Sequence, residues 1–333
     1  MVAELSLEPE CRRGHGAVYD ALNCGEVRIG GLRRALASLP LPAWDDGRIR
    51  LAVDVGNWLR PDAETSPGRL SCHCYARGKG NKQLIPGWPY SFIAVLGPGR
   101  TSWALPLDAV RLGPDDDPTE VTAAQLRDVV TRLAGAGHWS EGDPDIMIIL
   151  DSGYDLTRLA WLLRDLPVEI LGRLRSDRVM YSPPTPRQEA ASGRPARHGP
   201  EFRLDGKEPW PAPAATASTA TTRYGNAGAS AWPRLHQRLA RQRQWKDHPG
   251  PLPVIEDTLI RLAVDHLPGD RSPEPLWLWT TGASAAASAD ALNRTWRAFL
   301  RRFDIERSKP DCCHKSGCLS SLVPSASALV LAS

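Results

Sequence analysis

Apolar residues recur along the chain with two spacings, and each spacing predicts a different kind of element. Alternating or continuous apolar runs predict strands at 49–55, in both limbs of 71–96, at 146–150, 168–174, 255–264 and 276–279. Apolar residues at helical spacing predict helices at 17–22, 32–39, 119–136, 156–166 and 290–306. This order of strands and helices, with no internal repeat, predicts an α/β protein whose mixed sheet is flanked by helices.

Two stretches interrupt this pattern. Residues 182–222 are dense in Pro, Ala, Thr and Ser and poor in large apolar side chains, so they predict a linker or a loop-rich insertion. The run that follows, 234–246, is strongly basic and has Asp247 as its first acid. Either a solvated helix face or contact with phosphate groups would explain this charge.

These changes divide the chain into five parts. We expect a helical lead-in at 1–46, which would be a partial N-terminal domain, and the first part of a sheet core at 47–178. A Pro-rich, basic insertion or linker follows at 179–250, and the last strands and helix of the core occupy 251–306. Residues 307–333 have no helical periodicity and are expected to be a disordered tail.

Bulk composition limits the classes of protein without choosing one. The chain has 333 residues, 42% of them hydrophobic, which is enough for one sizeable core and a smaller second unit. No apolar run is long enough for a membrane helix, and seven scattered cysteines do not form a secreted disulfide framework. We therefore expect a cytoplasmic protein without a membrane partner. A net charge of +3 is too small to indicate a nucleic-acid partner by itself.

Acidic residues stand where strands are predicted to be buried. Asp54 lies within the first strand, and Asp151 follows the apolar run Ile-Met-Ile-Ile-Leu directly. Such acids could simply hydrogen-bond turns at strand ends. A buried carboxylate otherwise costs desolvation energy, and a bound cation is a strong partner for carboxylates on neighbouring strands. Oxygen ligands without a His or Cys shell suit Mg²⁺ in a two-metal phosphodiester site.

Several sequence pieces together resemble a known family. The pieces are "LAVDVGNWLRP", "IMIILDSGYD" and "FLRRFDIE", with "GRLRSDRVMY" and "IPGWPYSF" in support. In the third, Phe299, Arg302 and Glu306 have the spacing of a family motif in which Tyr is usual at the first position. Over residues 49–306 the chain resembles the DDE transposases of bacterial insertion sequences, whose catalytic domain is RNase H-like.

The resemblance implies a reaction and a set of roles. Asp54, Asp151 and Glu306 would be catalytic and would hold two Mg²⁺ ions, with Mn²⁺ as a substitute, for DNA cleavage and strand transfer. The implied partners are double-stranded DNA, as terminal inverted repeats and target, and a second copy of the chain; the implied location is the nucleoid. Arg302 would contact DNA phosphate or steady a carboxylate. The other DNA-binding residues would be Arg173, Arg175, Arg178, Arg238, Arg241, Arg243 and Lys246.

The end of the sequence departs from the family pattern. The family has a Lys seven residues after the Glu, whereas this chain has Cys313 there, and Pro310 would end the helix. We therefore expect a chain that is truncated at its N-terminus and truncated or frame-shifted after Glu306, with catalytic activity in doubt. The first alternative is a non-catalytic remnant that still binds DNA. The second is a haloacid-dehalogenase-like phosphatase, but that family needs an Asp where this chain has Gly56.

Two cysteine clusters raise the question of zinc. One is Cys72-His73-Cys74, and the other joins Cys312, Cys313 and His314 with Cys318. Neither has the paired Cys-x-x-Cys spacing of structural zinc sites. Incidental cysteines are therefore the favoured interpretation of both clusters.

Overall fold

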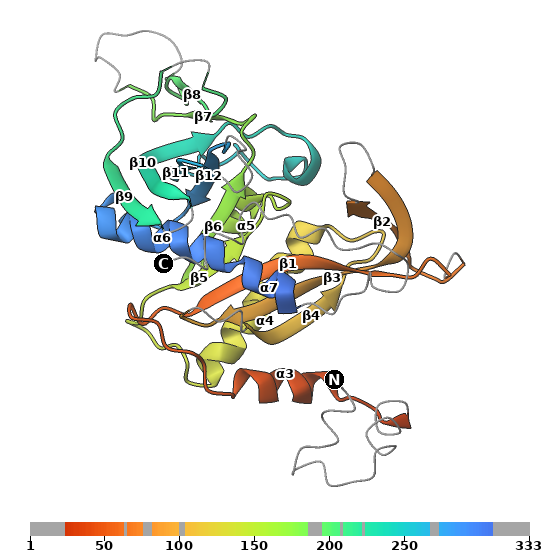
Figure 1. The fold of residues 1–333 in the computed structure, drawn as a ribbon. Helices are drawn as coiled ribbons and strands as arrows, with labels where there is room; N and C mark the ends of the chain where they lie inside the picture. Colours follow the sequence, from red (N-terminus) through yellow and green to blue (C-terminus); the bar gives the residue numbers. More distant parts are fainter. Residues whose placement is uncertain are drawn as a thin grey trace. The chain divides into compact units, whose positions relative to one another are not determined.

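The computed structural model describes residues 24–62, 65–75, 82–99, 104–185, 195–206, 209–221, 224–266 and 273–308 (Figure 1). The chain divides into two compact units, 1–39 and 40–333. The described part of the first unit contains helix α3 (Ile29–Ala37), close to the helix predicted at 32–39. The helix predicted at 17–22 lies outside the described residues. All other elements belong to the second unit.

The centre of the second unit is a mixed sheet of five strands. They are β1 (Arg50–Leu59), β3 (Lys82–Leu96), β4 (Ala104–Arg111), β5 (Ile146–Leu150) and β6 (Val168–Leu174), in the order β4-β3-β1-β5-β6. Strand β1 is antiparallel to β3 and parallel to β5, and β5 is parallel to β6. Strand β2 (Leu70–Tyr75) pairs with β3 to form a hairpin. The arrangement matches the mixed sheet predicted from the sequence.

Strand β4 was not predicted. Its buried residues Leu105 and Leu107 alternate with more exposed ones, which is the signal of a half-buried strand. Pro106 and Asp108 disfavour strands and hide that signal. The structure tolerates the buried Asp108 because Arg132 of helix α4 (Pro118–Gly135) forms an ion pair with it.

The sheet continues beyond β6 through two strands close to those predicted at 276–279 and 255–264, and then through strands in the residues that the sequence assigned to an insertion. The order is β6, β12 (Leu276–Thr280), β11 (Asp257–Val264), β10 (Gly225–Gln237), β7 (Val179–Tyr181) and β8 (Glu201–Arg203), with β9 (Ala215–Thr221) also paired to β10. The prediction of a linker or loops over 182–222 is therefore wrong at β8 and β9. The boundaries of the five predicted parts stay a prediction.

Small side chains explain why β9 and β10 escaped prediction. The buried positions that they contribute to the core cluster with α6 are alanines, which leave room for a helix to approach closely. Helix α6 (Ala289–Arg301) packs there, and its large residues Leu292, Trp296 and Phe299 complete the same core cluster. Where α6 meets β9 and β10, the large side chains of this cluster therefore come from the helix and the small ones from the strands. The alanines in this cluster are Ala217, Ala227, Ala229 and Ala231.

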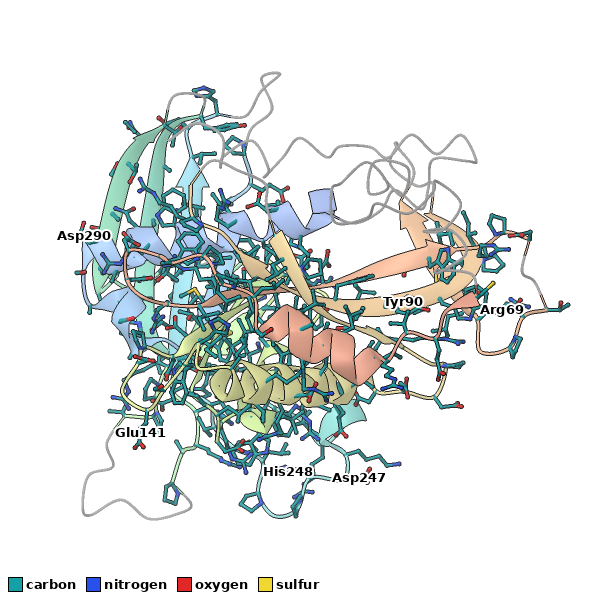
Figure 2. The ribbon with its side chains drawn as sticks, turned by 90° about the horizontal axis from the view of Figure 1, so that it is seen from below. Arg69, Tyr90, Glu141, Asp247, His248 and Asp290 are labelled. Carbon is teal, nitrogen blue, oxygen red and sulfur yellow. The ribbon has the colours of Figure 1, made fainter. Side chains whose placement is uncertain are left out.

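Helices cover both faces of the sheet (Figures 1 and 2). Helices α6 and α7 (Phe303–Ser308) cross one face, and α4 and α5 (Leu156–Leu162) lie on the other. The helix predicted at 290–306 is thus divided at Arg302, and the helix predicted at 156–166 ends four residues early. Among the described helices, none is long and apolar enough to cross a membrane.

One pair of substitutions tests whether β9 and β10 belong to the core. Ala229 in β10 is 2% exposed and faces α6, so Ala229→Leu should lower the free energy of unfolding by about 1–3 kcal/mol through overpacking. Ala220 in β9 is exposed, and Ala220→Leu should change it by less than about 0.5 kcal/mol. Urea denaturation of both variants measures the difference; equal small effects would mean that this stretch is a linker.

Candidate active site

Two acids meet because β1 and β5 run parallel. Ala52 of β1 pairs with Ile149 of β5, so continuing the register by two residues brings Asp54 level with Asp151. Neighbouring strands are about 4.8 Å apart, and residues at the same level of a parallel pair point to the same face. Ala52 and Ile149 belong to the core cluster that contains α6. The two acids therefore point to the face that α6 and α7 cover.

A buried arginine reaches one of these acids from the helical layer. Arg302 is 2% exposed, and its guanidinium lies 3.5 Å from Oδ2 of Asp151. The guanidinium also lies 5.8 Å from the ring centroid of Phe299 and 4.5 Å from that of Phe303. An arginine held in this way cannot turn out to solvent. Of its two predicted roles, burial therefore favours steadying a carboxylate over contact with DNA.

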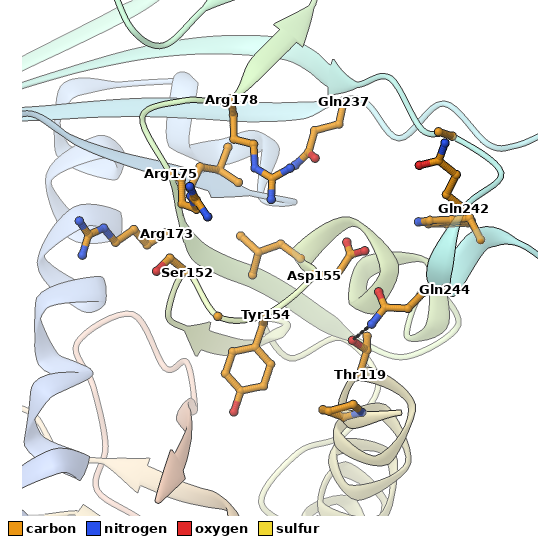
Figure 3. A pocket seen from close by; sticks show the side chains of 16 residues that line it. Thr119, Ser152, Tyr154, Asp155, Arg173, Arg175, Arg178, Gln237, Gln242 and Gln244 are labelled. Atoms are coloured by element: carbon orange, nitrogen blue, oxygen red, sulfur yellow. Dashed lines mark hydrogen bonds between the residues drawn. The ribbon is translucent and has the colours of Figure 1, made fainter. Parts of the chain in front are cut away.

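Tyr154 closes the same site from the turn after β5. Its hydroxyl is buried near Ser91 without a hydrogen bond of regular geometry to any described atom, and Figure 3 shows the ring directed away from the neighbouring pocket. Burial raises the pKa of Tyr154, and the nearby carboxylates of Asp54 and Asp151 raise it further. The hydroxyl therefore stays protonated close to both acids. Sequence reasoning missed this residue, although it lies in the quoted piece "IMIILDSGYD".

One oxygen of the acidic pair lacks a partner. Asp151 Oδ1 is buried and accepts no hydrogen bond from any described residue, whereas Oδ2 faces Arg302. A buried carboxylate oxygen without a partner costs free energy unless a cation or water occupies the space beside it. The donor set here consists of oxygens, which is the kind that Mg²⁺ prefers. The site therefore fits a divalent metal, although no cluster of three metal-ligating side chains occurs among the described residues.

The third predicted ligand lies on helix α7. Glu306 is one turn after Arg302 in the chain, and α7 packs against β1, the strand that carries Asp54. The side chain of Glu306 is outside the part of the structure that is described. The backbone thus brings the three predicted acidic positions to one region, while the contacts of the third carboxylate stay a prediction.

A second group of acids, Glu169 and Asp257, lies away from Asp54 and Asp151, and one of its members is fully paired with protein groups. Glu169 lies at the start of β6, at the opposite end of the sheet from Asp151, and is paired with Arg48 and with the hydroxyl of Thr280 at 2.9 Å. Burial, followed by the charges of Glu169 and Glu256, raises the pKa of Asp257 to about 7. Protein groups already satisfy the carboxylate of Glu169, so this acid needs no metal ion to offset its burial.

The predicted DNA-binding residues fall into three groups. Arg173, Arg175 and Arg178 line a pocket beside the Asp151 turn, and all three are exposed. Arg238, Arg241 and Lys246 are exposed in the loop after β10, where Arg241 donates to the carbonyl oxygen of His248 at 3.0 Å. Residues 243–245 form a short 3₁₀ turn, so the alternative of a helix over 234–246 is wrong. The side chain of Arg243 is not described.

One positive charge of the basic run 234–246 is paired with an acid from another part of the chain. Arg234 lies at a bulge in β10 with φ of 61° and pairs with Glu256 at 3.0 Å.

The zinc interpretation finds no support: Cys72 is buried and free, and the side chains of His73 and Cys74 and the whole terminal cluster are outside the described residues.

The pocket beside the Asp151 turn has a volume of about 490 Å³ (Figure 3). Its walls come from the turn 152–156, the end of β6, the N-terminus of α4 and the loop after β10. Gln244 ties this loop to α4, because its amide donates to the hydroxyl of Thr119 at 2.8 Å. Trp245 is buried behind it, and Arg158 lies 4.9 Å from its ring centroid. The loop is therefore held in place by the body of the protein.

The mixed sheet flanked by helices fits an RNase H-like fold, and it brings two of the predicted acids level with each other, with a buried arginine beside one of them. Residues 2–248 match the family described as DDE superfamily endonuclease, which covers most of the chain, and the chain therefore belongs to that family. The resemblance and fold class predicted from the sequence are confirmed. The match includes Asp54 and Asp151 and ends before Glu306. No curated protein matches the chain.

Membership of this family indicates a transposase-like nuclease that acts on DNA, and such endonucleases generally use divalent metals. The phosphatase alternative gains no support from this match. Gly56 still occupies the position where that family requires its second Asp.

Removal of Arg302 tests its place in the site. Arg302→Ala leaves the partly buried Asp151 without a counter-charge, and we expect the free energy of unfolding to fall by about 2 kcal/mol or more. Arg294 on the exposed side of α6 provides the matched control, and Arg294→Ala should cost less than about 0.5 kcal/mol. Denaturation of the two variants measures the difference. Equal effects of the two substitutions would show that Arg302 does not stabilise the acidic site.

Proposed function

We propose that this protein cleaves DNA and transfers strands at the ends of an insertion sequence, with Asp54, Asp151 and Glu306 as metal-binding catalytic residues. The observation that carries the proposal is the pairing of β1 with β5, which brings two acids together while one buried oxygen of Asp151 lacks a partner among the described residues. The location of Glu306 on a helix against β1 supports its inclusion.

The protein groups have separable tasks in this proposal. Asp54 and Asp151 provide oxygen ligands for Mg²⁺, with Mn²⁺ as a substitute. When bound, two such ions supply the activation of a water or 3′-hydroxyl and the stabilisation of the leaving oxygen. Arg302 supplies a positive charge beside Asp151 and orients it, and its guanidinium packs near the rings of Phe299 and Phe303. Tyr154 adds a buried, protonated hydroxyl close to both acids.

The proposed partners are the terminal inverted repeats of the element and its target DNA. The exposed arginines at the end of β6 provide a cationic surface directly beside the Asp151 turn. We also propose that the protein acts as a homodimer on the two paired ends of the element and that it is located at the nucleoid. If the third carboxylate cannot reach the other two, the same surface would give a protein that binds DNA without cutting it.

A nicking assay tests the chemistry. Supercoiled plasmid that carries the element's ends should be nicked in Mg²⁺ or Mn²⁺ and remain intact in EDTA. Asp54→Asn, Asp151→Asn and Glu306→Gln should each lower the rate at least about a hundredfold, since each removes a charged metal ligand. Asp177→Asn is the matched control, because this exposed acid pairs with Arg175 at the surface, and it should retain activity.

The outcomes separate the alternatives. Gel shifts without nicking would support a non-catalytic DNA-binding protein, and hydrolysis of small phosphate esters would support a phosphatase. Nicking that survives Asp151→Asn would contradict the proposed site.

Metal binding can also be measured without catalysis. A cation that binds only the folded site raises the melting temperature, and at a hundredfold excess over Kd the stabilisation is about 2.7 kcal/mol. We expect Mn²⁺ to raise the melting temperature of the unmodified protein and to have little effect on Asp151→Asn. A calorimetric scan with and without Mn²⁺ measures this, and identical shifts in both proteins would mean that the metal binds elsewhere.

A further inference from the structure

The outer edge of strand β9 has no partner among the described strands. Strand β9 pairs with β10 along its whole length, and Figure 1 shows it on the outer side of β10. Because backbone groups alternate in direction along a strand, about half of the N–H and C=O groups of β9 point away from β10. No described residue forms a hydrogen bond with these outward groups.

The sequence of β9 lacks the features that usually protect such an edge. Its seven residues are alanine, threonine and serine, without charge, proline or glycine. Its pairing with β10 is regular over all seven residues, so no bulge turns the edge away. Natural proteins usually protect an exposed edge by charges, proline, bulges or short length. The outer edge of β9 is therefore able to pair with a further strand.

The other strands at the edges of the described sheet carry such protection. Strand β8 is only three residues long and contains Glu201 and Arg203. Strand β4 contains Pro106 and Asp108, and β2 follows directly after Arg69. The uncharged edge of β9 therefore differs from these edges, and its composition is not a general property of this sheet.

Helix α6 holds β9 in position from one face of the sheet. Ala217 is 8% exposed and belongs to the core cluster with α6, and the hydroxyl of Thr219 donates to Oδ1 of Asn293 at 3.1 Å. A further strand would join in the plane of the sheet, about 4.8 Å from β9, and not on the face where α6 packs. Because the edge is already ordered, little conformational entropy is lost when a strand pairs with it.

The partner that fits this edge best is β9 of a second copy. In an antiparallel pair centred on Ser218, that residue lies opposite Ser218 of the partner subunit, and the remaining residues oppose each other as alanine and threonine. No like charges meet across the two-fold axis, where they would destabilise the pair. Such an isologous contact uses the same edge in both copies and is closed, so it gives a dimer and not a fibre.

We propose that two copies of this protein associate by antiparallel pairing of their β9 strands about a two-fold axis at Ser218, so that one sheet continues through both copies. The inference rests on the proposed function for the homodimer alone, and it names the surface of that homodimer. Two strands of this length form about six to eight hydrogen bonds in such a pair. The small side chains bury little apolar area, so we expect a weak dimer with a dissociation constant in roughly the micromolar range.

A charge exchange at the two-fold axis tests the pairing. Sedimentation of the full chain at low salt, without DNA or metal, should show a monomer and a dimer whose ratio depends on concentration. Ser218→Lys and Ser218→Glu each place like charges opposite each other and should weaken association at least about tenfold. An equimolar mixture of the two variants should restore association, because Lys then faces Glu. Ser140→Lys, in the exposed loop before β5, is the matched control and should associate like the unmodified protein.

A cross-link tests the position of the axis directly. Opposed residues of an antiparallel pair have Cα atoms about 4.5–5.5 Å apart, which is within the range of a disulfide. Mild oxidation of Ser218→Cys with copper phenanthroline should therefore link two copies. Mass spectrometry of a digest should find position 218 of one copy joined to position 218 of the other, whereas Ser140→Cys should give no link between its own positions.

Each outcome bears on one proposal or the other. A protein that stays monomeric at the highest concentration reached overturns the β9 interface, and so does a mixture of the Lys and Glu variants that associates no better than either alone. Association that persists in Ser218→Lys without the link at position 218 also overturns it, because the copies then meet elsewhere. Melting temperatures of all variants establish that they are folded. Metal-dependent nicking without β9 pairing means that only the interface fails; β9 pairing without nicking means that only the proposed function fails.

Discussion

The parallel pairing of β1 with β5 is the constraint on which the site depends. It fixes Asp54 and Asp151 at the same level on neighbouring strands, where two like charges would repel each other in a partly buried environment. Such a pair can persist only if positive charge is supplied close by. Arg302 supplies it from the protein at 3.5 Å, and the buried Oδ1 of Asp151, which no described residue contacts by a hydrogen bond, can accept more. The geometry of the sheet thus creates the need for a cation.

Packing far from the acids determines where Arg302 lies. Helix α6 can approach the sheet because β9 and β10 present alanines to it, and its large residues fill the gap that remains. At the end of the helix, Arg301 donates to the carbonyl oxygen of Gly97 at 2.9 Å and pairs with Asp304 at 2.8 Å, which anchors the junction with α7. The extended sheet is therefore part of the active site's support, although it contributes no ligand.

The sequence predicted the core strands and the acids more fully than the extension, for physical reasons. Burial of β5 on both faces leaves a continuous apolar run, and the acid that ends it is conspicuous. Toward α6, strands β9 and β10 bury alanines, whose small side chains give no strong periodic signal and suggest a linker. Burial of Arg302 depends on residues distant in sequence, so no local pattern could predict it. Tyr154 was visible in a quoted motif, but only the fold brings its hydroxyl near both acids.

The same extension also places exposed polar side chains on a loop that is separate from the core around the acids. The acids and Arg302 lie at the edge of the buried core, where side chains are closely packed. Gln237 and Gln242 lie at the end of β10 and in the loop after it, which Gln244 fastens to the N-terminus of α4. Changes at Gln237 or Gln242 alter groups without partners among the described residues and so leave the core intact. The groups on this loop can therefore change without disturbing the packing around Asp54 and Asp151.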